Sequence, residues 1–165
     1  MEMKLEGRVW KFGDNIDTDA IIPARFLSIS DKEELAKSCF ADLRPGFYQG
    51  VQKGDILVAG NNFGSGSSRE HAPLAIKEAG ISAIIAKSYA RIFYRNSFNI
   101  GLPLLESPEA VDSVQEKDRI AIDLITGEIR KMGGGKRFFA KPIPDFMRRI
   151  VQSGGLVEYI KGEIG

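Results

Sequence analysis

Short apolar runs alternate with stretches of helical periodicity along the first two thirds of the chain. Runs bounded by glycine or polar residues predict β-strands at residues 5–12, 55–59, 81–86 and 102–105. Stretches that favour helices lie at residues 32–40, 70–79 and 90–97. Asp31 is suited to cap the first helix, and Gly80 is expected to end the second. Alternation of strands and helices in this order predicts a parallel α/β layer.

The last third of the chain has a different pattern. Residues 120–124 and 129–131 flank a Thr-Gly turn and predict a β-hairpin, to which residues 136–140 are expected to add a strand. Two prolines then break the chain before a predicted helix at residues 145–152. With no internal repeat and no long linker, residues 1–165 are expected to form one mixed α/β domain.

Composition and charge narrow the class of protein. Across 165 residues, 23 Lys and Arg stand against 22 Asp and Glu, so the net charge of +1 predicts no basic surface for nucleic acid. No run approaches the about 18 consecutive apolar residues of a membrane helix, and residues 1–6 lack the apolar core of a secretory signal. A single cysteine, Cys39, can form neither an internal disulfide nor a metal site by itself. We expect a cytoplasmic protein that binds neither nucleic acid nor membrane.

Glycine and small polar residues crowd the segment between the second predicted strand and the second predicted helix. Residues 60–73 read Gly-Asn-Asn-Phe-Gly-Ser-Gly-Ser-Ser-Arg-Glu-His-Ala-Pro. Exposed backbone N–H groups and the dipole of the following helix favour an anion, and the glycines let a ligand approach the backbone. Ser67, Ser68 and Arg69 add side-chain donors, and arginine can grip a carboxylate or phosphate with two hydrogen bonds. The loop is predicted to bind an anion, with a tight structural turn as the alternative.

Well-known nucleotide-binding and hydrolase loops do not match this segment. A P-loop needs a lysine after its last glycine, and a dinucleotide-binding loop needs a third glycine where Arg69 stands. A nucleophile elbow needs a glycine two residues to each side of its serine, which no serine here has. A Ser67 hydroxyl beside an arginine could instead act as a base next to a bound carboxylate. The alternative is that Ser67 or Ser68 only caps the helix.

The remaining polar residues offer no convincing metal site. His71, the only histidine, lies four residues after Ser67, where it could orient a catalytic group or serve a structural role. No cluster of histidine, cysteine and carboxylates has zinc spacing. Residues 15–19 resemble the start of a calcium loop, but Ala20 replaces its glycine and Phe26 stands where the bidentate Glu belongs. These aspartates are predicted to serve in turns and caps, with a polar contact to the site as the alternative.

Three segments carry a resemblance to a known family: residues 14–23, 60–72 and 87–103. In order and spacing they resemble the swivelling domain of the aconitase superfamily, in particular the small subunits of 3-isopropylmalate dehydratase, over nearly the whole chain. The resemblance implies an α/β fold, a single swivelling β/β/α domain like the C-terminal domain of aconitase. It also implies a hydro-lyase that interconverts 2-isopropylmalate and 3-isopropylmalate by dehydration and rehydration in leucine biosynthesis.

The resemblance further implies a partner, a cofactor and residue roles. In the family, cysteines of a separate large subunit hold a 4Fe–4S cluster, so this chain would bind no cofactor alone and would act only with that partner. Ser67 matches the family's alkoxide base and Arg69 its ligand for a carboxylate of the small hydroxy dicarboxylate substrate. Gly66 and Ser68 lie beside them as substrate-binding residues. Glu70 and His71 belong to the same motif, as supporting residues without a firm role.

Substrate choice is implied by the loop that follows residues 21–23. In the family this loop contacts the variable part of the substrate; here it contains Arg25, Phe26, Leu27, Ser28 and Ile29. Ser28 replaces an arginine of homoaconitase-like subunits, which favours an apolar branch such as isopropyl, although Arg25 could compensate. One methyl group alters affinity by only about 1 kcal/mol, so homoaconitate and methylmalate- or citramalate-type acids stay open. A non-catalytic anion-binding module is the alternative of a different class, and the presence of both a serine and an arginine in the loop weakens it.

Overall fold

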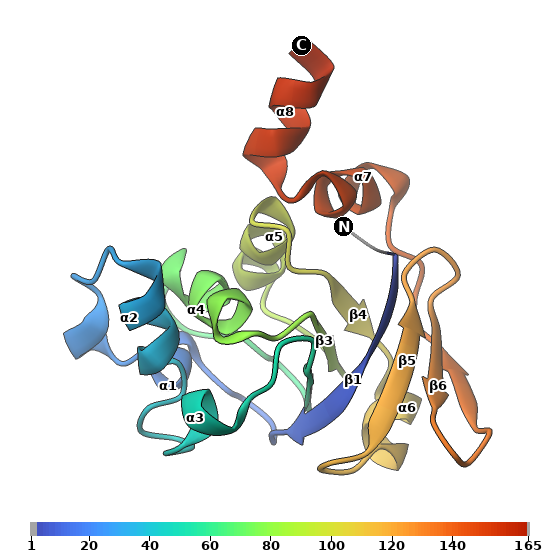
Figure 1. The fold of residues 1–165 in the computed structure, drawn as a ribbon. Coiled ribbons are helices and arrows are strands. Elements are labelled where there is room, and N and C mark those ends of the chain that lie inside the picture. Colours follow the sequence, from blue (N-terminus) through green and yellow to red (C-terminus); the bar gives the residue numbers. More distant parts are fainter. Residues whose placement is uncertain (1–2, 165) are drawn as a thin grey trace.

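A seven-stranded sheet forms the centre of the structure, a computed structural model that describes residues 3–164 (Figure 1). Its strand order is β4–β3–β2–β1–β5–β6–β7. The strands are β1 (Lys4–Lys11), β2 (Ile56–Ala59), β3 (Ala83–Ala86), β4 (Leu104–Glu106), β5 (Arg119–Asp123), β6 (Glu128–Lys131) and β7 (Arg137–Phe139). Strands β1 to β4 pair in parallel, whereas β1–β5, β5–β6 and β6–β7 are antiparallel. The predicted parallel layer and the predicted hairpin are both confirmed.

Nine helical segments surround the sheet within residues 3–164. They are α1 (Thr18–Ile21), the 3₁₀ turn η1 (Ala24–Phe26), α2 (Lys32–Ser38), α3 (Phe47–Gly50), α4 (His71–Ala79), α5 (Arg91–Asn99), α6 (Pro108–Ser113), α7 (Asp145–Ser153) and α8 (Leu156–Ile164). No helix in that range is long and apolar enough to cross a bilayer.

The central strands are apolar at every position because both faces of the sheet are covered. All residues of β2 and β3 are buried. Leu57 and Ile84 are register partners that join the core under α2, α4 and α5, whereas Val58 and Ile85 face the core beside α6. This two-sided burial explains why the sequence of these strands does not alternate.

Four short or terminal helices were not expected from the sequence: α1, α3, α6 and α8. The first two have four residues each, which is too short for a helical periodicity to show. Asp31 does cap α2 by accepting a hydrogen bond from Glu33 N, and Gly80 ends α4. Of the aspartates expected in turns and caps, Asp17 caps α1 through a bond from Ala20 N.

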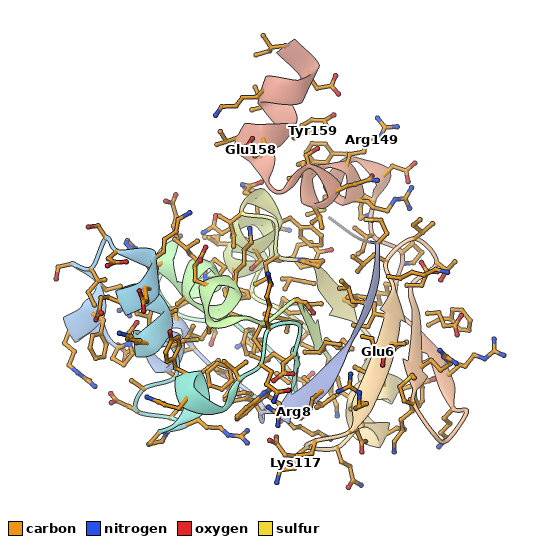
Figure 2. The ribbon with its side chains drawn as sticks, in the orientation of Figure 1. Glu6, Arg8, Lys117, Arg149, Glu158 and Tyr159 are labelled. Atoms are coloured by element: carbon orange, nitrogen blue, oxygen red, sulfur yellow. The ribbon has the colours of Figure 1, made fainter. Side chains whose placement is uncertain are left out.

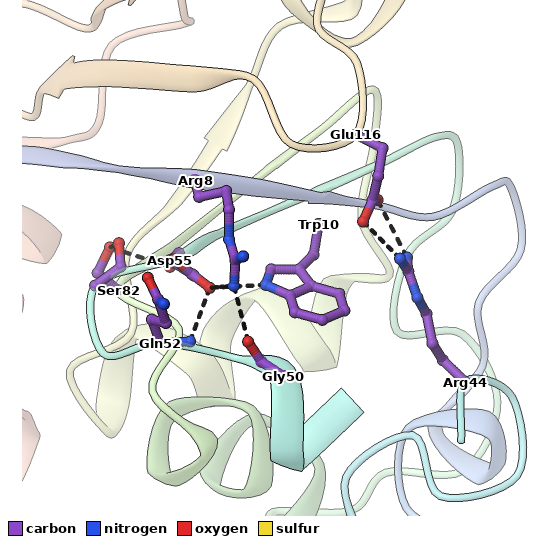
Figure 3. A network of polar contacts seen from close by, with 9 residues as sticks. Arg8, Trp10, Arg44, Gly50, Gln52, Asp55, Ser82 and Glu116 are labelled. Carbon is purple, nitrogen blue, oxygen red and sulfur yellow. Dashed lines mark hydrogen bonds and ion pairs between the residues drawn. The ribbon is translucent and has the colours of Figure 1, made fainter. Parts of the chain in front are cut away.

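A polar network ties the start of β2 to β1 (Figure 3). The buried Asp55 carboxylate accepts hydrogen bonds from Trp10 Nε1 at 2.8 Å, Arg8 Nη2 at 3.1 Å and Gln52 N at 2.8 Å. Nearby, Arg44 pairs with Glu116 at 2.5 Å, and its guanidinium lies 4.7 Å from the centre of the Trp10 ring. The network therefore fixes the start of β2 to the second half of β1.

Candidate functional site

The candidate site lies at the carboxyl ends of β1, β2 and β3, where the three motif segments meet. Gly64 N donates to Ile16 O at 2.8 Å, which joins the segment after β2 to the segment after β1. Phe63 N donates to Ser88 O at 3.0 Å and Ala90 N to Phe63 O at 3.0 Å, which joins it to the segment after β3. Loops at the carboxyl ends of parallel strands are the usual ligand sites of α/β sheets.

The glycine-rich loop after β2 and the start of α5 line a pocket of about 290 Å³ at this edge. Gly66, Ser67, Ser68 and Arg69 form one side, and the other side comes from the start of α5, with Ala90, Arg91, Ile92, Phe93 and Asn96. The structure thus brings together four of the residues predicted from the sequence. The approach of α5 requires glycine at position 64, because a Cβ there would lie 2.2 Å from Phe93 Cγ in a backbone with φ of +85°.

Ser67 is exposed at the pocket and does not cap a helix. Helix α4 begins at His71 with Glu70 as its N-cap, and no side chain satisfies that end. The capping alternative for Ser67 and Ser68 is therefore wrong. Within residues 3–164, the hydroxyl and the backbone N–H of Ser67 have no hydrogen-bond partner. They are free to meet a ligand.

Arg69 is anchored at one nitrogen and open at the others. Its side chain is 18% exposed, and Nη1 donates to Ile22 O at 3.1 Å and to Asp19 Oδ1 at 3.3 Å. Among the described residues, Nη2 and Nε have no acceptor. This anchoring pre-positions the guanidinium, and the open donors can bind a carboxylate. Asp19 thus makes the polar contact to the site that was the alternative for the aspartates after β1.

Residues of α5 belong to the site although the sequence did not single them out. Arg91, Ile92 and Asn96 line the pocket opposite the serines. The Arg91 side chain forms no ion pair or hydrogen bond within residues 3–164. Together with Arg69 and the N-terminal turn of α5, it makes the pocket electropositive, which supports the predicted anion site. Their place within the third motif segment was the only signal in the sequence.

The predicted substrate loop lies apart from this pocket. Arg25 forms a two-fold ion pair with Asp42, at 2.7 and 2.6 Å, and its guanidinium lies 4.5 Å from the centre of the Phe26 ring. The hydrogen bond from Arg25 lowers the pKa of the Asp42 carboxyl. Leu27 and Ile29 pack against the core, and Ser28 is exposed. None of these residues lines the pocket with Ser67.

The supporting candidates also lie outside the pocket lining. His71 is partly exposed at the first position of α4, and Glu70 is exposed just before it. Cys39 is buried, and burial raises the pKa of its thiol well above the ordinary value. In the described range, no group of three or more His, Cys, Asp or Glu residues is placed to hold a metal ion. The residues of this chain do not fit an iron–sulfur cluster as its ligands.

Comparisons with known proteins agree with this geometry. The family model of the aconitase C-terminal domain matches residues 48–110, which include the serine–arginine loop and the start of α5. A 3-isopropylmalate dehydratase small subunit from Caldicellulosiruptor bescii is 58% identical over 98% of this chain and 98% of its own. A small subunit from Aquifex aeolicus is 54% identical over 99% of this chain and 98% of its own. The crystal structure of 3-isopropylmalate dehydratase from Methanocaldococcus jannaschii superposes with a TM-score of 0.91 at 45% identity, over 98% and 96% of the two chains. The predicted aconitase-like fold is confirmed.

Proposed function

The chain belongs to the family of 3-isopropylmalate dehydratase small subunits, and from this premise we propose that it supplies Ser67 and Arg69 to an active site completed by a large subunit. The family is one of hydro-lyases of leucine biosynthesis, as the sequence predicted. The observation that carries the proposal is that Ser67 and Arg69 line one pocket, with the Ser67 hydroxyl unused by the fold.

Ser67 is proposed as the base. Dehydration of a 2-hydroxy acid removes a proton from the carbon beside the C–OH carbon and expels hydroxide, so a C=C bond forms and water is the product. The Ser67 oxygen would accept that carbon-bound proton and return it when water adds in the opposite sense. Alkoxide character at Ser67 is favoured by the positive charges of Arg69 and Arg91 and by free backbone N–H groups.

Arg69 is proposed to hold a substrate carboxylate beside Ser67. Two parallel N–H donors from Nη2 and Nε fix the orientation of a carboxylate, which aligns the neighbouring C–H bond with the base. Neutralising the carboxylate charge also makes that C–H bond easier to deprotonate. Gly66 and Ser68 would let the acid approach the backbone from the same side.

The large subunit is proposed to hold the 4Fe–4S cluster, because the described residues of this chain offer no ligand set for it. Bound there, the cluster supplies a Lewis acid for the hydroxyl group of the substrate. Residues 1–165 would act as one domain that swings over the partner and closes the site in the cytoplasm. Ser67, rather than the neighbouring Ser68 of the same pocket, is assigned the proton step because its place in the motif matches the family's base.

The loop with Phe26, Leu27, Ser28 and Ile29 is proposed to select an apolar substrate branch. Asp19 connects the loop to the site. Its carboxylate accepts one hydrogen bond from Arg69 Nη1 and another, at 3.3 Å, from Ala24 N at the start of the loop. Arg25 is held by Asp42, so it is not free to bind the extra carboxylate of homoaconitate. This pairing favours isopropylmalate over a tricarboxylic acid.

Reconstitution tests the proposal. The chain and its large subunit are combined anaerobically, and ultraviolet absorbance of the unsaturated intermediate follows turnover of 3-isopropylmalate and of homoaconitate. We expect turnover only with both chains present, and at least about tenfold higher kcat/KM for 3-isopropylmalate. Equal kcat/KM values would contradict the assignment of the loop. Binding of the acid without turnover by the reconstituted pair would instead favour the non-catalytic anion-binding module.

A further inference from the structure

The C-terminal helices leave an apolar surface open on the side of α5. Helix α8 projects from the body of the molecule, and none of its residues is buried (Figure 1). Val157, Ile160 and Ile164, spaced by three and four residues, share one face of α8 and are 63%, 45% and 83% exposed. Figure 2 shows side chains of α8 pointing into solvent above its first turn, where Glu158 and Tyr159 lie. Apolar side chains exposed in such a row indicate a binding surface.

A groove lies between the start of this helix and the rest of the molecule. It has a volume of about 400 Å³ and runs between α5, α7 and the start of α8, with Tyr94, Phe98, Phe146, Met147 and Leu156 among its lining residues. Phe146 is 62% exposed. We call this groove and the exposed face of α8 together the C-terminal surface.

The C-terminal surface is continuous with the candidate active site. Arg91 lines both the groove and the pocket that contains Ser67. Helix α5 has nine residues, so the groove extends no more than about 13 Å along it from Arg91. A standard protein interface covers about 800 Å² per partner, a disc of about 16 Å radius. Any partner that closes over Ser67 with such a footprint would reach the groove.

The charged residues beside the groove indicate what kind of partner surface would bind there. Arg91 and Arg95 border the groove, and neither forms an ion pair within residues 3–164. An apolar segment flanked by carboxylates would fill the groove and pair with the Arg95 guanidinium, which leaves the charge of Arg91 to the pocket.

We propose that the C-terminal surface docks the large subunit, through an apolar segment flanked by acidic residues. This inference rests on the proposed function, since that function places the large subunit over Ser67. Helix α8 would then act as an arm that extends the contact beyond the rim of the active site.

The double variant Val157→Ser/Ile160→Ser tests the proposal, because both side chains are exposed and the fold does not need them. Turnover is titrated with increasing large subunit, which separates the half-saturating concentration from the rate at saturation. We expect that concentration to rise at least about tenfold with an unchanged saturated rate. Arg95→Glu should raise it as well, whereas Arg95→Lys should not. Met132→Ser, in the turn after β6 at the far edge of the sheet, is the matched control and should leave it unchanged.

An unchanged half-saturating concentration for the double variant would overturn the proposal. Sedimentation of the chain alone identifies the rival occupant: if the same variant breaks up a self-assembled form and leaves the titration unaltered, α8 binds a second copy. Failure of the proposed function has a different signature, since it would appear as full turnover by a Ser67→Ala enzyme whatever the titration shows.

Discussion

The Thr18 hydroxyl donates a 2.8 Å hydrogen bond to the backbone carbonyl of Ser67, 49 residues away in the sequence. Thr18 is 2% exposed, and its own N–H donates to Ser65 O at 2.8 Å. The first turn of α1 therefore holds the loop that presents Ser67, from two points on one residue. Thr18 is a positioning residue: it fixes the backbone of the base without supplying a reacting group.

Thr18→Val should lower kcat with little change in KM. Loss of one hydrogen bond of about 1 kcal/mol that orients the base predicts a fall of about five- to tenfold. Thr18→Ser keeps the hydroxyl and should restore the rate. A variant whose kcat is unchanged although it folds normally would show that the loop holds Ser67 without this bond.

Arg69→Lys should weaken substrate binding, because a point charge cannot reproduce two parallel donors. A charge-assisted hydrogen bond contributes about 2 kcal/mol, so kcat/KM should fall about 30-fold, mainly through KM. Steady-state kinetics of the reconstituted enzyme measures this, with Arg137→Lys on the exposed strand β7 as the control. Unaltered kinetics would remove Arg69 from the carboxylate site.

Features of the fold that neighbouring residues determine could be predicted from the sequence, whereas contacts between residues distant in the chain could not. Local signals predicted the strands β2 and β3, the Asp31 cap and the end of α4 at Gly80. The position of Arg91 opposite Ser67 depends on strand β3 and the loop after it, which bring α5 against the glycine loop. Only the motif segment around Arg91 hinted at its role.

Two features differ from what the sequence suggested, because backbone conformation and long-range contacts decide them and a local sequence pattern contains neither. Serine near a helix start usually caps it, but here the loop takes positive φ at Gly64 and Gly66 and the helix begins only at His71. Arg25 appeared free to meet an additional carboxylate, yet Asp42 binds it 17 residues later. The presence of the anion-binding loop could be predicted, whereas the pairing of each arginine required the fold.

Asp55→Ala should destabilise the chain by about 3 kcal/mol, because it leaves the partly buried Arg8 and the Trp10 and Gln52 N–H groups without their acceptor. For a domain of this size, the melting temperature should fall by about 6–12 °C in a calorimetric or circular dichroism melt. Asp42→Ala removes an exposed ion pair and is the matched control, for which a change within about 1 kcal/mol is expected. Equal effects of the two changes would show that the Asp55 network is not stabilising.

Cys39 should be inert in the folded chain. It is 1% exposed, and burial raises the pKa of its thiol, so neither access nor thiolate favours alkylation. Iodoacetamide at pH 8 should label it only after unfolding in denaturant, as mass spectrometry would show. Rapid labelling of the native chain would mean that the core around α2 opens.

The central claim is that Ser67 provides the base, and the turnover of Ser67→Ala tests it most directly. The variant chain is combined with the large subunit, association is measured by sedimentation, and isomerisation of 3-isopropylmalate is followed under saturating partner. Because the Ser67 side chain makes no contact that the fold requires, association should equal that of the wild-type chain, and kcat should fall at least about a thousandfold. Turnover within about tenfold of the wild-type rate, with association intact, would contradict the assignment of Ser67 as the base.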